Sequence, residues 1–218
     1  MSPRPRTVPD STILAAAARA VSRRGPARVT LADVGQEVGL SAATLVQRFG
    51  SKRGMLLAVA RTGADDVVRE FAAAREGHRR PLAALMAALV GLSAWAATPE
   101  MLSNQLAFLQ IDLTDPEFHR HALAHARAMR SEITRLLDEA VAAGELVRAD
   151  TARLARAVQG AYNGALVTWA VYREGSVADW LREEVGAVLA PYRSTPPRRT
   201  AEPRFERRRE PKSRTRRS

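Results

Sequence analysis

Residues 42–48 combine small and hydrogen-bonding side chains at helical spacing. The side chains expected on the outward face are Ala42, Ala43, Thr44, Gln47 and Arg48. Small residues near the start of a helix permit close approach to another surface, and amide and guanidinium groups bind base edges or phosphates. This segment therefore has the chemistry of a helix that enters the major groove of DNA.

Two side chains of this helix leave alternatives open. Arg48 could bind a phosphate, which we favour, or form a bidentate contact to guanine, which discriminates between bases by about 1–3 kcal/mol. Val46 could touch a thymine methyl group. The alternative for the whole segment is a helical hairpin without a DNA partner, because such hairpins also occur in other proteins.

The preceding residues predict the element that positions this helix. Thr30 and Asp33 match a weak capping box, in which each residue satisfies a backbone N–H of the other. The apolar positions that follow have helical spacing and predict one buried stripe, formed by Leu31, Val34 and Val38.

A tight turn is expected between the two helices. Gly39 can adopt the positive φ that such a turn needs, and Leu40 can fill the junction of the helices. Ser41 can cap the second helix, while Leu45 and Phe49 anchor it inward. Together these features predict a helix-turn-helix over residues 30–49.

The rest of the chain shows helical periodicity without strand-like alternation, which predicts an all-α fold. We expect a three-helix head that a connecting helix joins to a C-terminal helical domain for regulation and dimerisation. Glycine and proline separate the segments. The expected helices cover residues 10–24, 30–38, 42–48, 52–75, 81–97, 99–112, 116–143, 151–174 and 177–190.

The net charge of +11 is concentrated at the two ends of the chain. Residues 1–62 carry +7, residues 63–192 carry −4, and residues 193–218 carry +8. Clustered basic side chains bind phosphates, so DNA contact is expected at the ends and another role in the middle. We divide the chain into four parts: a flexible basic arm (1–9), a DNA-binding domain (10–56), a ligand-binding and dimerisation domain (57–192) and a disordered basic tail (193–218).

Both basic ends leave alternatives open. Arg4 and Arg6 of the arm could reach a minor groove or could simply be solvated. The tail has four prolines and no aliphatic pattern, which predicts disorder; it could add nonspecific DNA affinity or remain in solvent.

Several classes of protein are not supported by the sequence. The chain has no cysteine, which excludes disulfides and thiolate metal sites. No run of 18 apolar residues or signal-peptide pattern occurs, and we expect a soluble cytoplasmic protein without a membrane partner. No catalytic or cofactor-binding motif stands out, so we expect no enzyme and no cofactor.

The segment from Val29 to Leu57 resembles the head of TetR-family transcriptional regulators. It contains Thr-x-x-x-Val-Gly-x-x-x-Gly-Leu-Ser-x-x-Thr-Leu, followed by Phe-x-Ser-Lys and Leu-Leu. This resemblance implies a homodimer in which Thr30, Thr44 and Lys52 meet phosphates and Ala43, Thr44 and Gln47 face bases. The full set of DNA-contact candidates is Thr30, Ser41, Ala42, Ala43, Thr44, Gln47, Arg48 and Lys52.

The chain departs from the family pattern at three positions. Val46 and Arg48 stand where members commonly have aromatic residues, and Gly35 stands where alanine is usual. The resemblance therefore predicts DNA contact and leaves the base sequence unspecified. Weaker similarity to the family's regulatory domain occurs at residues 115–118, 143–146 and 160–169.

Large adaptable side chains gather in the middle of the chain, where most should belong to the core. Three polar residues, Gln105, Tyr162 and Asn163, lie on otherwise apolar helices, which is typical of a ligand pocket. We expect a small apolar or amphipathic effector there. The candidate lining is Trp95, Met101, Gln105, Phe108, Met129, Tyr162, Asn163 and Trp169.

Three histidines lie close together in residues 119–125. His121 and His125 are one helical turn apart, as a metal pair could be, whereas His119 faces another side. We favour a solvated, partly cationic helix start and assign no metal.

The last two helices carry apolar faces that we expect to pair with a second copy in a four-helix bundle. Their apolar residues exceed what the core of one chain would need, although packing within one chain is the alternative. These residues are Leu154, Val158, Ala161, Ala165, Val177, Trp180, Leu181, Val185, Val188 and Leu189.

These observations predict a DNA-binding repressor that a small-molecule effector releases from a palindromic operator. The alternative is a helical partner-binding protein or a ligand-independent, nucleoid-type DNA-binding protein. The effector, the operator sequence and the direction of regulation are not determined by the sequence.

Overall fold

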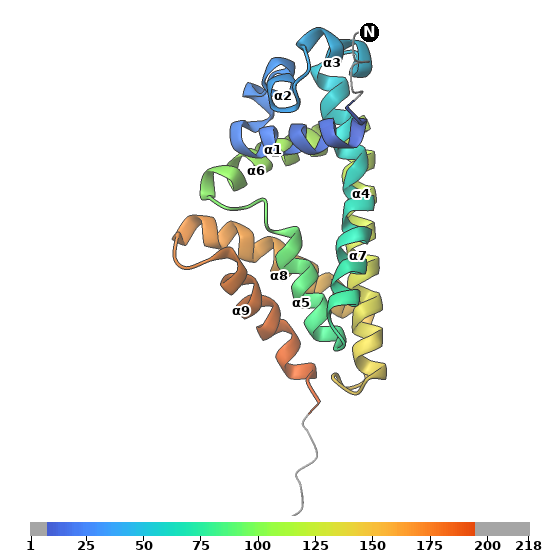
Figure 1. The fold of residues 1–218 in the computed structure, drawn as a ribbon. Helices are drawn as coiled ribbons and strands as arrows, with labels where there is room; N and C mark the ends of the chain where they lie inside the picture. Colours follow the sequence, from blue (N-terminus) through green and yellow to red (C-terminus); the bar gives the residue numbers. More distant parts are fainter. Residues whose placement is uncertain (1–7, 195–218) are drawn as a thin grey trace, which may run out of the picture.

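The computed structural model describes residues 8–194, which form nine α-helices and one short 3₁₀ turn over residues 190–192 (Figure 1). Within this range no strand occurs, and the all-α prediction is confirmed. The arm residues Arg4 and Arg6 and the tail from residue 195 lie outside the described residues. The helices are α1 (Asp10–Arg28), α2 (Leu31–Val38), α3 (Ala42–Phe49), α4 (Lys52–Gly77), α5 (Pro81–Leu92), α6 (Pro99–Thr114), α7 (Pro116–Ala142), α8 (Thr151–Tyr172) and α9 (Val177–Leu189).

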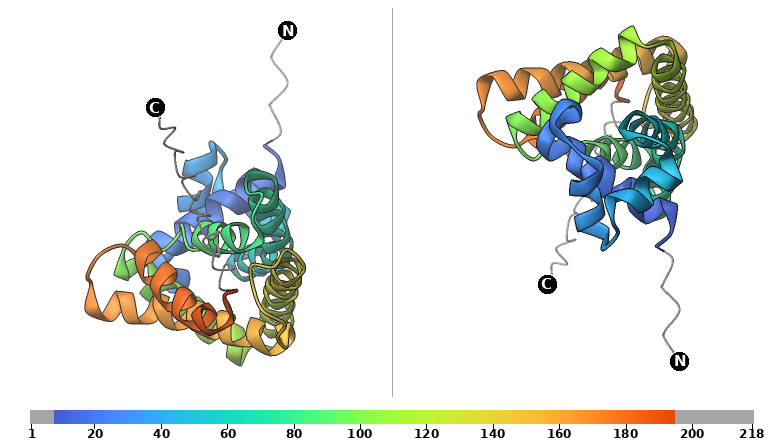
Figure 2. Two further views of the ribbon diagram at one scale, coloured as in Figure 1. Left: turned by 90° about the horizontal axis from the view of Figure 1, so that it is seen from below. Right: turned by 90° about the horizontal axis from the view of Figure 1, so that it is seen from above.

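Helices α1, α2 and α3 form a head at one end of the molecule (Figure 1). Helices α4 and α7 run side by side away from the head, and α6 lies against α1. Helices α8 and α9 pack together on the side opposite the head, as the views along the long axis show (Figure 2). The long α4 therefore connects the head to the rest of the chain.

Two hydrophobic clusters divide the interior. One lies in the head and includes Leu45 and Met55, and the other includes Val67 and Phe71, farther along α4. The head cluster also contains Phe108 of α6 and Phe118 of α7, whose rings meet edge to face at 5.9 Å. The core of the head is thus completed by two aromatic side chains of the later helices.

The local signals for the helix-turn-helix are confirmed. Thr30 and Asp33 form the reciprocal capping box, and the Ser41 hydroxyl accepts a hydrogen bond from the Thr44 N–H at 3.1 Å. Gly39 has φ 71°, in the left-handed region. Gly35 also permits close packing in this turn, because a Cβ there would lie 2.4 Å from the Leu40 carbonyl oxygen.

Two helix ends differ from the prediction. The fifth helix ends at Leu92 instead of residue 97, where the Ser93 hydroxyl donates to the Val90 carbonyl at 2.7 Å and competes with the helical pattern. Helix α1 runs on to Arg28 across a kink at Gly25, whose φ is 78° and ψ 158°. The break at Gly25 was predicted, whereas the short helical continuation was not.

The apolar faces of α8 and α9 also require a correction. We expected them to exceed the needs of one core, but Leu154, Val158, Ala165, Leu181, Val185 and Leu189 are buried within the single chain. The exposed side of α8 instead carries the small residues Gly160 and Gly164 beside Val167 and Val171. A Cβ at either glycine would meet nothing within 4 Å.

Candidate nucleic-acid interface and neighbouring cavity

Helix α3 presents one face to solvent at the outer end of the head (Figure 1). Its inner face is held by Leu45, which is fully buried, and by Phe49, which packs against the head cluster. Ala43, Val46 and Gln47 are exposed. The outward face thus combines a small residue at the helix start with one amide that can form hydrogen bonds.

Every acidic side chain of the described head is paired with an arginine. Glu37 lies 2.9 Å from Arg19 and 2.6 Å from Arg23. Burial raises the pKa of Glu37, but hydrogen bonds from the two arginines outweigh this effect and lower it below the usual value. The remaining two pairs are Arg24–Asp33 at 3.1 Å and Arg48–Asp10 at 3.1 Å. No unpaired carboxylate therefore opposes a phosphate backbone within residues 8–62.

Arg48 does not point freely away from the head. Its Nη1 donates to the Val8 carbonyl at 2.6 Å and to Asp10 Oδ1 at 3.1 Å. In this geometry the guanidinium fastens the segment before α1 to the end of α3. Both bonds engage Nη1, so a contact of Arg48 with DNA would use the N–H groups of Nε or Nη2 or would require these bonds to be released.

Thr30 and Lys52 lie where the helices of the head begin. Thr30 caps α2, and hydrogen bonds from its hydroxyl and backbone N–H hold the pKa of Asp33 below the usual value. Lys52 Nζ donates to the Ala27 carbonyl at 2.7 Å. Ala42 and Thr44 are half-buried at the start of α3, and Ser41 is exposed.

Polar contacts tie the head to α6 and α7. Arg53 binds Asp115 at 2.7 Å and Glu117 at 2.8 Å, and its guanidinium lies 5.4 Å from the centre of the Phe118 ring. Asn104 Nδ2 donates to the Ser22 carbonyl at 2.8 Å, close to the kink in α1. Movement of α6 or α7 would therefore also displace α1 or the start of α4, because these contacts join them.

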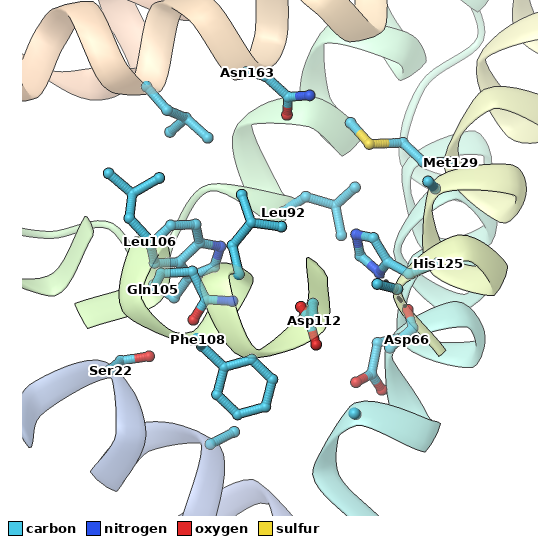
Figure 3. A pocket seen from close by; sticks show the side chains of 18 of the residues that line it. Ser22, Asp66, Leu92, Gln105, Leu106, Phe108, Asp112, His125, Met129 and Asn163 are labelled. Carbon is cyan, nitrogen blue, oxygen red and sulfur yellow. Dashed lines mark hydrogen bonds between the residues drawn. The ribbon is translucent and has the colours of Figure 1, made fainter. Parts of the chain in front are cut away.

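A cavity of about 580 Å³ lies between α1, α4, α6, α7 and α8 (Figure 3). The structure brings together six of the eight predicted lining residues here: Trp95, Gln105, Phe108, Met129, Tyr162 and Asn163. Met101 and Trp169 are not part of this wall. Trp169 is buried in the other cluster, and its Nε1 donates to the Gly175 carbonyl at 3.3 Å.

Two aspartates of the cavity wall were missed by sequence reasoning. Asp66 comes from α4 and Asp112 from α6, and the two side chains lie near each other in the view of Figure 3. The available signal for Asp112 was its register, since it follows Phe108 by four residues and Gln105 by seven on one helix face. Asp66 lies in a polar stretch of α4 that gives no such signal.

Asp112 is electrostatically unusual. Its Oδ1 is buried without a hydrogen-bond partner among the described residues. Burial raises the pKa of this carboxyl to about 6, and the nearby His119 opposes the rise only in part. A carboxylate in this state gains from any cation that enters the cavity.

The three histidines do not gather into a metal site in the described range. His121 and His125 line the cavity, and His119 does not; His119 and His125 are both exposed. His125 Nδ1 lies 3.0 Å from the Gly63 carbonyl oxygen. Residues 8–194 contain no group of three or more histidine, cysteine or acidic side chains that could hold a metal ion.

Between residues 8 and 194, no helix combines the length and the apolar character that crossing a bilayer requires.

Comparison with known proteins agrees with the geometry of the head. Residues 13–59 match the family described as bacterial regulatory proteins, tetR family. The chain is 32% identical over 121 residues to the HTH-type transcriptional regulator BetI of Agrobacterium fabrum. That alignment covers 54% of this chain and 58% of the regulator, so the chain matches little more than half of this relative's length.

Solved structures share the whole fold. A protein from Rhodococcus sp. described as a TetR-family transcriptional regulator is 25% identical, with a TM-score of 0.63, and the match covers 83% of this chain and 96% of that one. SmeT, the repressor of the Stenotrophomonas maltophilia multidrug efflux pump SmeDEF, shares the fold at 21% identity and a TM-score of 0.61, covering 86% and 92%. Residues 13–59 are thus similar to the TetR family of bacterial regulatory proteins, and residues beyond this head share the fold of these solved structures.

Proposed function

We propose that this protein is a dimeric repressor that binds a palindromic DNA operator in the cytoplasm and is released by a small-molecule effector. The observation that carries the proposal is the outward face of α3, presented by a capped helix-turn-helix whose acidic residues are all ion-paired. The similarity of residues 13–59 to the TetR family supports this function over a partner-binding protein, a nucleoid-type protein or an enzyme.

The proposed DNA contacts fall into two groups. The exposed Ala43 and Gln47, together with Thr44, face the bases, while Thr30, Ser41 and Lys52 bind phosphates. Arg48 holds the segment before α1 in place and contributes to binding indirectly, because its guanidinium already has two acceptors.

The proposed route from effector to DNA passes through α6. Phe108 lines the cavity and also belongs to the head cluster, so a ligand that displaces it changes the packing beneath α1. Asn104 transmits the same movement to the Ser22 carbonyl. An effector lowers DNA affinity only if it binds more tightly to the arrangement of heads that does not fit the operator.

The second copy is proposed to pack on α8 and α9. The exposed small residues of α8 allow two helices to approach closely, and a two-fold axis there would pair the two heads for inverted half-sites. This arrangement needs the solvent-facing side of α8, since its other side is already buried in one chain.

Gln47→Ala and Lys52→Gln test the DNA contacts by different readouts. With DNA selected by the wild-type protein, Gln47→Ala should relax specificity at one position by about 1–3 kcal/mol, whereas Lys52→Gln should weaken binding to all sequences. For Lys52→Gln, the slope of the logarithm of the binding constant against the logarithm of the salt concentration should become less steep by about one.

Lys52→Arg is the matched control, because it keeps the charge and should restore most of the affinity. Titrations by fluorescence anisotropy against selected and scrambled duplexes measure these effects. Unchanged binding by both Gln47→Ala and Lys52→Gln would overturn the assignment of this face.

A further inference from the structure

The walls of the cavity have a one-sided charge. Among residues 8–194, no lysine or arginine lines the cavity. The charged side chains of the wall are the two aspartates, Asp66 and Asp112. An anionic ligand would meet these carboxylates without a lysine or arginine beside them, since the basic side chains of the wall are His121 and His125.

The two aspartates differ in what they already bind. Asp66 accepts a hydrogen bond from the Thr62 hydroxyl at 3.0 Å and forms an ion pair with Arg69. Asp112 Oδ1 is buried and has no partner among the described residues, which is costly for a polar atom and more so for a charged one. Asp112 is therefore the group that a ligand would complete.

We propose that the effector is a lipophilic organic cation, a protonated amine on an aromatic or aliphatic body, whose ammonium N–H donates to Asp112. The inference rests on the proposed function, in which the cavity is the effector site. It names the chemical class of the effector and the residue that selects it.

The rest of the wall suits the body of such a molecule. Phe108 lies one helical turn before Asp112 on α6, where its ring can face a cation held by the carboxylate. Trp95, Leu102 and Met129 supply apolar contact, and a cavity of about 580 Å³ is within the range that holds drug-sized ligands. A neutral ligand of the same shape would leave Asp112 unpartnered.

Three compounds that differ only in their head group test the charge preference: 4-phenylbutylammonium, 4-phenylbutanol and 4-phenylbutyrate. Calorimetric titration of the full-length protein at neutral pH should rank them cation, alcohol, anion. The cation should bind roughly 10- to 100-fold more tightly than the alcohol, as expected for a hydrogen bond to a charged group.

Asp112→Asn should remove this preference and leave the affinity for the alcohol nearly unchanged. Asp66→Asn is the matched control, because that carboxylate is already engaged, and it should keep the preference. The melting temperature of each variant without ligand shows that it is folded.

A pH series gives a second readout. Because the pKa of Asp112 is raised to about 6, acidification through pH 6 neutralises it while the alkylammonium group stays charged, and the preference should fall. The other titratable side chains near Asp112 are His119, His121 and His125 of α7, Asp66 of α4 and Tyr162 of α8. The Asp112→Asn protein measures the pH dependence that these other groups contribute.

Three results would overturn the inference: no binding of the cation at millimolar concentration, equal or tighter binding of the alcohol, or an unchanged preference in Asp112→Asn. None of these results would affect DNA binding by α3, which is measured without ligand. Loss of sequence-selective DNA binding would instead overturn the proposed function, so the two failures can be told apart.

Discussion

At the scale of the residue, Asp112 is the side chain whose surroundings have the clearest physical consequences. It is held in an apolar wall with one oxygen buried and unpartnered. Since burial raises its pKa from 3.8 to about 6, the ionised form is less stable in the folded protein than in the unfolded chain. The residue thus favours ligand binding and opposes folding.

Asp112→Asn is accordingly expected to raise the melting temperature at pH 7.5. The folded-state pKa lies above the unfolded value, so the destabilisation is fully present above pH 6 and diminishes as the pH falls toward 3.8. The gain should therefore shrink in thermal unfolding experiments at pH 5. Asp65→Asn, at an exposed position of α4, should leave the melting temperature close to wild type. An Asp112→Asn protein that melts below wild type at pH 7.5 would contradict this reading.

Some of these residues could be predicted from the sequence, and the reason is periodicity. Phe108 and Tyr162 stand out as large side chains on apolar helices, and the structure places both in the cavity wall. Met101 and Trp169 satisfy the same pattern but lie outside that wall, because the pattern does not specify which helices face one another. Arg48 pairs with Asp10, which lies 38 residues away in the chain. This pairing also depends on which helices face one another, and a periodic pattern does not specify that.

At the scale of the element, α6 and the start of α7 connect the cavity with the head. The Arg53 side chain that contacts Asp115 and Glu117 is more than half exposed, so these ion pairs add little to the stability of the fold. Their geometric role is larger than their energetic one, because they hold the start of α4 against the start of α7.

Arg53→Ala should therefore weaken the coupling between effector and DNA more than it weakens either binding event. The ratio of DNA affinities without and with a bound effector should fall severalfold toward one, while the fold remains intact. Arg130→Ala, at an exposed position of α7, is the control. A variant that binds DNA and releases it like wild type would show that the coupling follows another route.

The exposed face of α8 gives a second prediction at this scale. Gly164→Glu places a charge on the face where a second copy is proposed to pack, and should convert the dimer to a monomer. The helix itself should not suffer, since glutamate has a better helix propensity than glycine. Sedimentation equilibrium measures the change, with Ala124→Glu on the exposed side of α7 as the control. A Gly164→Glu protein that stays dimeric would place the interface elsewhere.

The helix boundaries were largely predictable from the sequence, since capping and helix-breaking residues act on their neighbours in the chain. Ser41 and the Thr30–Asp33 box begin helices where the sequence places them. The end of α5 was missed because a serine hydroxyl within an apolar run was read as part of the helix. The apolar sides of α8 and α9 were assigned to a second copy. A periodic pattern shows that a helix face is apolar, but it does not show whether the same chain or a second copy covers that face.

At the scale of the whole molecule, the distribution of charge and the packing of the two hydrophobic clusters relate the head to the cavity. The basic segment over residues 8–62 includes helices α1, α2 and α3 at one end of the molecule, and most of the cavity wall comes from the more acidic segment that follows. The head cluster is closed by Phe108 and Phe118 from that second part. A change in the cavity is therefore also a change in the packing of the head.

Selection of bound duplexes from a random DNA pool tests the central claim most directly, because it reports DNA binding, base preference and half-site spacing together. The full-length protein should enrich an inverted repeat whose half-sites lie about one helical turn apart or a multiple of it. The enrichment should be lost in Gln47→Ala or shift at one position of each half-site. A pool that remains random, or one that yields unpaired half-sites, would contradict the account of a dimeric operator-binding regulator.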